Sequence, residues 1–183
     1  MPQEDILNSP VIDPDFHDRL IQNLEGFARD ANITPFWIGE PAQDHLPDTV
    51  LEWLRGIRNP QSHDLLLDNS SKLDGQVVCS AMAGALLRNY IGVKVMSLSD
   101  FIMTVEKHSP ASETCVLIPN FHTKGDSASL APWRRGLLLD GLVKRQLAGH
   151  RTVLITNDAK AAGVDYGPGI RALLENSYEM HVV

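Results

Sequence analysis

The stretch LLLDNSSKLDGQVVCSAMAGALLRN, residues Leu65 to Asn89, decides the fold of this chain. Three leucines fit a buried strand, eight residues of turn-forming types follow, and a helix comes next. The apolar helix positions recur at three-and-four spacing and are Val78, Met82, Ala85 and Leu86. A strand, a loop and a helix N-terminus in this order are the layout of a phosphate-binding loop.

The residues of this loop differ from those that bind a nucleotide. A working loop reads G-x-x-x-x-G-K-[ST], because glycines let backbone N–H groups surround the phosphates, the Lys reaches them and the hydroxyl holds Mg²⁺. At those four places this chain has Asn69, Asp74, Gly75 and Gln76. Lys72 comes too early to replace the missing Lys without rebuilding the turn. We therefore predict the scaffold of a nucleotide site without its chemistry, and no cofactor or metal.

Composition and charge exclude several classes of protein. The chain has 183 residues, 43% of them hydrophobic, which suits one compact domain with a short extra segment. The net charge of −7 disfavours nucleic-acid binding, which depends on Lys and Arg. No run approaches the about 20 apolar residues of a membrane span. Because residues 1–10 are acidic and polar rather than a signal peptide, we expect a soluble, cytoplasmic protein.

The cysteines and histidines show no metal or redox spacing. Cys79 and Cys115 lack the C-x-x-C pattern, so we predict buried free thiols. Two possible arrangements of a catalytic nucleophile have even less support in the sequence. Ser97 to Asp100 fits a strand end and helix cap, and Cys115 with His122 lacks a third group.

The remaining chain alternates strands with helices, which predicts a parallel α/β sheet covered on both faces. We expect five strands, with Leu65 to Leu67 in the central one, and an irregular connector over residues 32–47. Helices are expected at residues 13–30, 48–58, 76–89, 100–107, 130–148 and 170–174, and further strands at 93–98, 114–118, 152–156 and 179–183. In the helix at 130–148, Trp133 is expected to face inward.

The order of these segments resembles a known family. The runs GVKVMSLSDFI, CVLIP and VLITN, with their spacing, are similar to the AAA+ ATPase domain of bacterial helicase loaders and transposition helper ATPases, the DnaC/IstB group. The resemblance implies a three-layer, P-loop NTPase-like AAA+ core over residues 32–183, preceded by an N-terminal helical extension at 1–31. It also implies that Asn157, after the fourth core strand, occupies the place of a polar sensor residue.

Three further parts of that family's machinery are replaced. Pro119 and Asn120 stand where the family has two acids that hold the Mg²⁺ and water system. Gly169 and Leu173 stand at the places of the arginines that reach a neighbouring subunit, with Arg171 out of register. Only residues 108–113 fill the place of a DNA-gripping insertion. Together with the altered loop, these departures predict a degenerate member without ATP turnover.

The favoured hypothesis is therefore a non-catalytic protein of DNA replication or transposition, of a kind encoded by phages or mobile elements. It would act by contacting a helicase, a loader or an initiator. The first surface to test consists of apolar residues on the predicted N-terminal helix and connector: Phe16, Phe27, Phe36, Trp37 and Ile38.

Two alternatives stay open. The first is a divergent P-loop ATPase with ATP and Mg²⁺, in which Lys72 replaces the usual Lys and Asp126 or Asp140 replaces the metal acids. The second is a nucleic-acid-binding accessory protein. Its binding residues would be Arg134, Arg135, Lys144 and Arg145.

Overall fold

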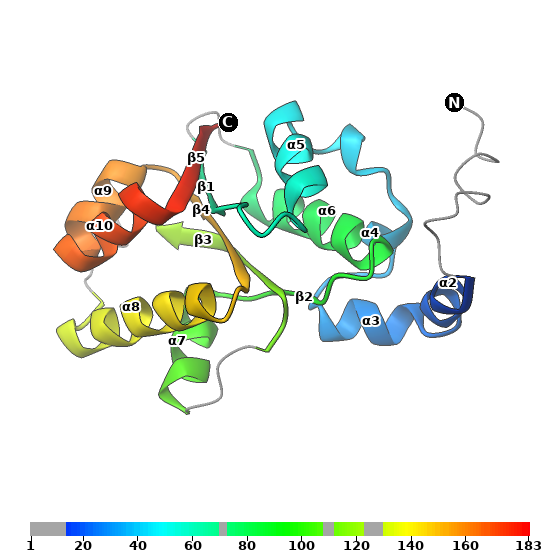
Figure 1. Cartoon of the computed structure of the whole chain (residues 1–183), viewed down its shortest axis with the longest axis horizontal. Coiled ribbons are helices and arrows are strands. Elements are labelled where there is room, and N and C mark those ends of the chain that lie inside the picture. The colour runs from blue at the N-terminus through cyan, green and yellow to red at the C-terminus, as the bar shows by residue number, and fades with distance from the viewer. Residues whose placement is uncertain (1–13, 70–72, 108–111, 123–129) are drawn as a thin grey trace.

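A five-stranded sheet, parallel throughout, runs through the protein in the order β2-β3-β4-β1-β5 (Figure 1). The computed structural model describes residues 14–69, 73–107, 112–122 and 130–183. The strands are β1 (Asp64–Asp68), β2 (Val93–Val95), β3 (Cys115–His122), β4 (Arg151–Thr156) and β5 (Tyr178–Val182). The helices are α2 (Pro14–Gln22), α3 (Leu24–Asp30), α4 (Phe36–Gly39), the 3-10 turn η1 (Ala42–Asp44), α5 (Asp48–Gly56), α6 (Gly75–Arg88), α7 (Leu98–Glu106), α8 (Pro132–Leu147), α9 (Ala159–Tyr166) and α10 (Pro168–Ser177).

The predicted strand, loop and helix at residues 65–89 are confirmed as β1, the following loop and α6. One detail of the prediction was wrong, because β4 rather than β1 is the central strand. The last strand of the chain, β5, pairs with β1 on its outer side, so that β1 lies one place from the edge. Strand β1 is still buried on both faces, and this burial accounts for its continuous run of leucines.

Helices cover both faces of the sheet and give the predicted three layers (Figure 1). Because side chains alternate along a strand, Leu65 and Leu67 belong to one core and Leu66 to the other. The first core is closed by residues of α3, α4, α5 and α6, and the second by residues of α7, α8, α9 and α10. Both cysteines are free and buried, as predicted.

The N-terminal part departs from the predicted elements. The single helix expected at 13–30 is two helices, α2 and α3, separated at Asn23. The connector, expected to be irregular, contains the helical turns α4 and η1. Ala31 is buried after α3, and its carbonyl accepts a hydrogen bond from the Val95 N–H at 2.9 Å. This contact ties the N-terminal helices to edge strand β2, while a domain boundary at residue 31 stays a prediction.

Two further differences concern helices near the C-terminus. Trp133 is 54% exposed at the start of α8, whereas it was expected to face inward. Helix α9 was not predicted, although Asp158 caps it by accepting a hydrogen bond from the Ala161 N–H at 2.8 Å. Within the residues that the structure describes, no helix is long and apolar enough to cross a bilayer.

A buried polar group lies where β1 and β4 begin. Arg145 of α8 is only 2% exposed and donates to the carbonyls of Arg151 at 2.7 Å and Glu113 at 3.1 Å. Beside it, Asp64 accepts a hydrogen bond from the Thr152 N–H at 2.7 Å. Burial raises the pKa of Asp64 from 3.8 to about 6, although this bond and the charges of Arg151 and Arg145 oppose the shift.

This shift makes the stability of the fold depend on pH. The folded protein binds the Asp64 proton more tightly than the unfolded chain does. Protonation of Asp64 therefore stabilises the fold, and this contribution is fully present below pH 4 and is lost as the pH rises to about 6. The loss should be about 3 kcal/mol in the free energy of unfolding. Asp64→Asn keeps an acceptor for Thr152 without a titrating group, so urea unfolding at several pH values should show a smaller decrease for the variant. Equal decreases in the two proteins would contradict this.

Candidate functional site

The candidate site lies where the carboxyl ends of β1, β3 and β4 meet, the usual position of ligands in open parallel sheets. It comprises the loop between β1 and α6, residues Pro119 to His122 at the end of β3, and Thr156 to Asp158 after β4. Lys72, the proposed substitute for the phosphate-binding Lys, lies outside the described residues, as does Asp126. The site must therefore be judged from Asn69 and from residues 73–76 of the loop.

The side chain of Asn69 closes the loop on itself. It is buried, and its Oδ1 accepts a hydrogen bond from the Leu73 N–H at 2.8 Å while its Nδ2 donates to the Leu73 carbonyl. A glycine at this place would leave the backbone free to surround a phosphate. Asn69 instead uses both ends of its amide to hold the loop.

Asp74 takes up the backbone donors at the start of α6. Its carboxylate accepts hydrogen bonds from the N–H groups of Gln76 at 2.9 Å and Val77 at 3.4 Å. These are the groups that a phosphate would need at a helix N-terminus. A phosphate would have to displace a carboxylate that is part of the chain, and the two negative charges would repel each other.

Gly75, at the place of the phosphate-binding Lys, lies directly against β3. A Cβ atom added to Gly75 would come within 2.5 Å of the Pro119 carbonyl oxygen and 3.6 Å of Ile155. The first distance is shorter than atoms in contact allow, and the obstacle is backbone. Pro119 itself stands where the resemblance places a metal-binding acid. The described residues of the loop therefore do not fit a magnesium nucleotide, since no side chain has room at residue 75.

Acidic groups dominate the rest of this edge, and each of four has a partner within the chain. Asp74 caps α6, Asp158 caps α9, and Asp68 accepts a longer hydrogen bond from the Ala159 N–H at 3.4 Å. Asp165 pairs with His122. Asn157, the expected sensor residue, is exposed, and its N–H donates to the His122 carbonyl at 3.4 Å.

The pairing of His122 with Asp165 was missed in the sequence. His122 is 5% exposed, and its Nε2 lies 2.7 Å from Asp165 Oδ2. Tyr166 stacks edge-on against Phe121 and His122, and its hydroxyl donates to the Phe121 carbonyl. No sequence pattern indicated this cluster, because Asp165 and Tyr166 belong to the unpredicted helix α9.

Other residues that the sequence analysis weighed for catalysis are not brought together at this edge. Cys115 begins β3 while His122 ends it, and burial raises the pKa of Cys115 to about 12. Arg171 is exposed and pairs with Glu175 at 2.8 Å. Asp140 pairs with Lys144 at 2.7 Å along α8. Among the described residues, no group of three or more His, Cys, Asp or Glu side chains could hold a metal ion.

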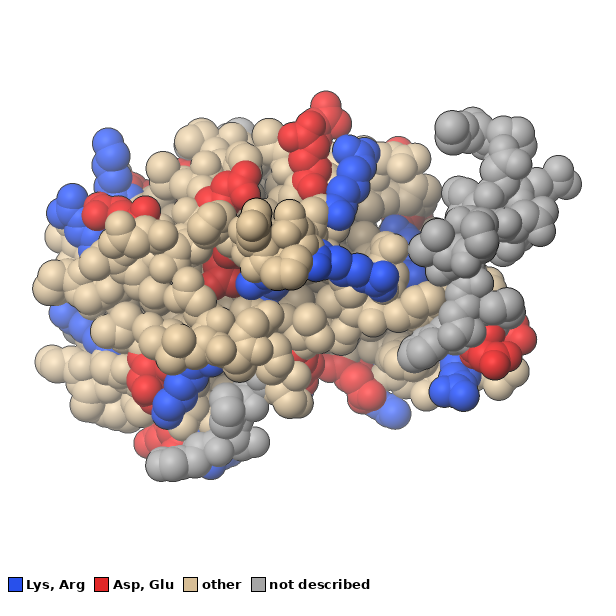
Figure 2. All heavy atoms as spheres, viewed as in Figure 1, with Lys and Arg blue, Asp and Glu red and all other residues tan. Residues whose placement is uncertain are grey.

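The four predicted nucleic-acid contacts do not form one basic surface. Arg145 was a wrong candidate because it is buried. Arg135 donates to the Leu130 carbonyl at 2.8 Å, and Arg134 stacks over Trp133 at 5.2 Å. On the face shown in Figure 2, basic and acidic side chains are interspersed.

The five residues of the predicted partner surface differ in exposure. Phe36 is 59% exposed, whereas Trp37 and Phe27 are half-buried. Ile38 is 3% exposed and packs in the core, so an exposed patch cannot include it. Phe16 lies on α2, and its side chain is outside the described part of the structure.

Helix α4 holds Phe36 at the surface. The guanidinium of Arg88 donates to the carbonyls of Ile38 and Glu40, both at 2.7 Å. Gly84 of α6 lets the Trp37 carbonyl approach so closely that a Cβ would lie 1.9 Å from it. The connector is thus fixed on α6, with Phe36 left in solvent.

Comparison with known proteins gives a likeness in fold. No protein-family model and no curated protein matches the sequence. Three similar solved structures are a DNA replication initiation factor and two of the replication initiator DnaA. One DnaA, from Aquifex aeolicus, is bound to AMPPCP, and the other to AMPPCP and single-stranded DNA.

In each case the identity is 9%, and the match covers 78% of this chain and 49% of the other, so this chain spans about half the length of those proteins. The TM-scores are 0.61, 0.61 and 0.60. At this identity the likeness concerns the fold alone, and the DnaC/IstB group is not among these structures. The chain therefore has the AAA+, P-loop NTPase-like fold of the replication initiator DnaA.

Proposed function

We propose that this chain is a degenerate, non-catalytic AAA+-like protein of DNA replication or transposition that acts by contacting a helicase, a loader or an initiator. The observation that carries the proposal is the contact between Gly75 and the Pro119 carbonyl. Where a nucleotide-binding relative needs a long cationic side chain, this chain has room for none.

The absence of turnover follows from how phosphoryl transfer is catalysed. The reaction depends on positioning and on charges that stabilise the transferred group, supplied by a Lys, metal ions and arginines. Among the described residues of this edge, the carboxylates of Asp68, Asp74, Asp158 and Asp165 are committed to backbone N–H groups or to His122. They support the structure of the edge and leave no arrangement for a metal and a triphosphate.

A role in replication is supported by the fold and by the expected loader-like order of segments. A protein that keeps an AAA+ core without nucleotide chemistry retains its surfaces, and an exposed aromatic on a rigid support suits recognition. Phe36 meets that description, since Arg88 fixes the turn that carries it. We therefore assign the partner surface to Phe36 and the exposed part of Trp37.

Magnesium ATP should not stabilise the protein. A ligand at a hundred times its dissociation constant raises the free energy of unfolding by about 2.7 kcal/mol. We expect the same melting temperature with magnesium ATP as in a control that contains magnesium chloride and adenosine. We also expect no release of phosphate from ATP. An increase of about 2.7 kcal/mol in the free energy of unfolding, together with ATP hydrolysis, would contradict this. It would favour the divergent ATPase, in which Lys72 and Asp126 or Asp140 replace the usual groups.

Phe36→Ala should remove partner binding without unfolding the protein. Because Phe36 is exposed, its replacement should change the free energy of unfolding by less than about 0.5 kcal/mol. The tagged wild type, purified from its native cells, should recover a helicase, loader or initiator that the variant loses.

Leu147→Ala is the matched control, since Leu147 is 82% exposed at the end of α8 and should retain the partner. Ile38→Ala shows the cost of disturbing the core, about 2 to 5 kcal/mol. Equal recovery by wild type and Phe36→Ala would exclude this surface, and recovery of no replication protein by the wild type would contradict the proposed function.

A further inference from the structure

Strand β5 forms an edge of the sheet that is open on its outer side. It pairs with β1, and no described residue hydrogen bonds to its other side. Met180 is 59% exposed and Val182 is 70% exposed. Native proteins usually protect such edges, because unpaired N–H and C=O groups with apolar side chains invite another strand.

The direction of the backbone groups follows from one hydrogen bond. The Val183 N–H donates to the Asp68 carbonyl at 3.0 Å, so Val183 points toward β1. Backbone groups of alternate residues point to opposite sides of a strand. The backbone N–H and C=O groups of Glu179 and His181 therefore point toward β1. Those of Tyr178, Met180 and Val182 point outward.

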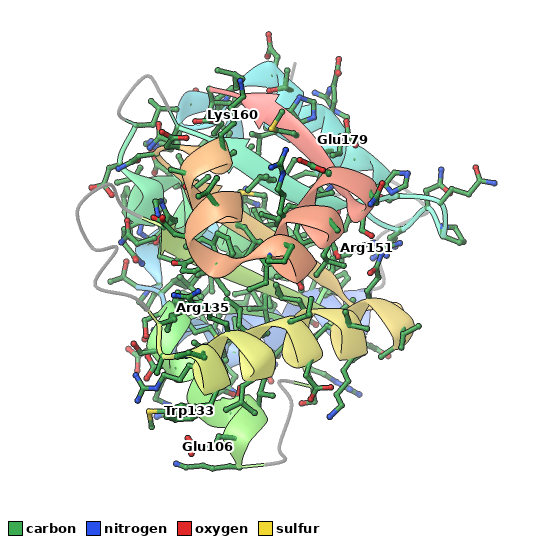
Figure 3. The ribbon with its side chains drawn as sticks, turned by 90° about the vertical axis from the view of Figure 1, so that its left-hand side faces the viewer. Glu106, Trp133, Arg135, Arg151, Lys160 and Glu179 are labelled. Carbon is green, nitrogen blue, oxygen red and sulfur yellow. The ribbon has the colours of Figure 1, made fainter. Side chains whose placement is uncertain are left out.

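The side chains divide in the same alternation between the two faces of the sheet. Tyr178 packs in the core beneath α10, so Met180 and Val182 lie on that face. Glu179 and His181 lie on the other face, where they line a hollow of about 350 Å³ together with residues of α5 and of the segment before β1. In Figure 3, Glu179 lies at the opposite end of the view from Trp133 on α8 and Glu106 on α7.

We propose that β5 is a dimerisation strand, which pairs antiparallel with β5 of a second copy of this chain about a two-fold axis at Met180. A two-fold axis perpendicular to the sheet keeps each face of the sheet on its own side. Residues that lie opposite each other in the two strands must then point their side chains to the same face. The axis therefore lies level with one residue, between its two copies, and not level with a peptide bond. An axis at Glu179 would place two carboxylates opposite each other, and an axis at His181 would place two imidazoles opposite each other, whereas an axis at Met180 places only the two apolar Met180 side chains opposite each other. At Met180, Glu179 of each copy faces His181 of the other.

The backbone pattern agrees with this register. Met180 would lie opposite Met180, and Tyr178 opposite Val182, as hydrogen-bonded pairs, because these are the residues whose groups point outward. Glu179 and His181 would then occupy the other kind of pair, in which side chains approach more closely. Within one chain the two already interact, with His181 Nε2 2.9 Å from Glu179 Oε1. The dimer would join both pairs on one face and bury Met180 and Val182 on the other.

The test is the mass of the full-length protein by analytical ultracentrifugation over a concentration series. The wild type should approach the mass of two chains. Met180→Pro should stay a monomer with an unchanged melting temperature, because the lost N–H points away from β1 and proline is tolerated on edge strands. A wild type that remains monomeric, or a dimer that survives Met180→Pro, would overturn the proposal.

An exchange of charges tests the register. His181→Glu places Glu179 opposite a carboxylate twice in the dimer and should weaken dimerisation about tenfold or more. Adding Glu179→His to that variant restores opposite groups and should restore the dimer. Failure of this restoration would exclude the axis at Met180. If the wild type is monomeric and instead binds an added peptide strand that Met180→Pro rejects, the occupant is a foreign strand and the second copy is excluded.

Discussion

The approach of α6 to the backbone of β3 governs the structure of the candidate site. Gly75 at the start of the helix meets the Pro119 carbonyl, and Gly84 farther along meets the carbonyl of Trp37. The helix is buried from Val78 to Leu87, between the sheet on one side and the connector on the other. Two glycines thus let the helix pack closely against backbone on both sides. The cost is that no side chain can extend from residue 75 into the loop.

Side chains of the chain itself occupy the backbone hydrogen-bond donors at the carboxyl edge of the sheet. A nucleotide-binding protein leaves helix N-terminal donors free for its ligand. Here Asp74 and Asp158 occupy those donors, and Asn69 ties the loop together. Acids at helix N-termini are also favourable for the helices themselves, since they complement the helix dipole. The edge that would bind a ligand in a relative stabilises the fold in this chain.

Periodicity and turn chemistry predicted most of the fold. The five strands and the helices after β1 and β3 were found because buried strands read as continuous apolar runs and helices show three-and-four spacing. The helix after Asp158 begins at a local side-chain cap, whereas the break at Asn23 has no side-chain cap, and neither feature gave a clear periodic pattern in the sequence. The order of strands placed β5 beyond β1, which no pattern within either strand specifies. In the site, the altered residues were visible in the sequence. The contact of Gly75 with Pro119 and the pairing of His122 with Asp165 were not, because they join distant segments.

The most direct test is the free energy of unfolding of Gly75→Ala against Gly136→Ala. Gly136 lies within α8 with nothing within 4 Å of an added Cβ, so alanine there should stabilise by about 1 kcal/mol. At Gly75 the added atom meets the Pro119 backbone, and we expect destabilisation of about 1 to 3 kcal/mol. Equal free energies of unfolding for Gly75→Ala and Gly136→Ala would contradict this account. In that case α6 would not pack against β3 as described, and a side chain would have room at the place of the phosphate-binding Lys.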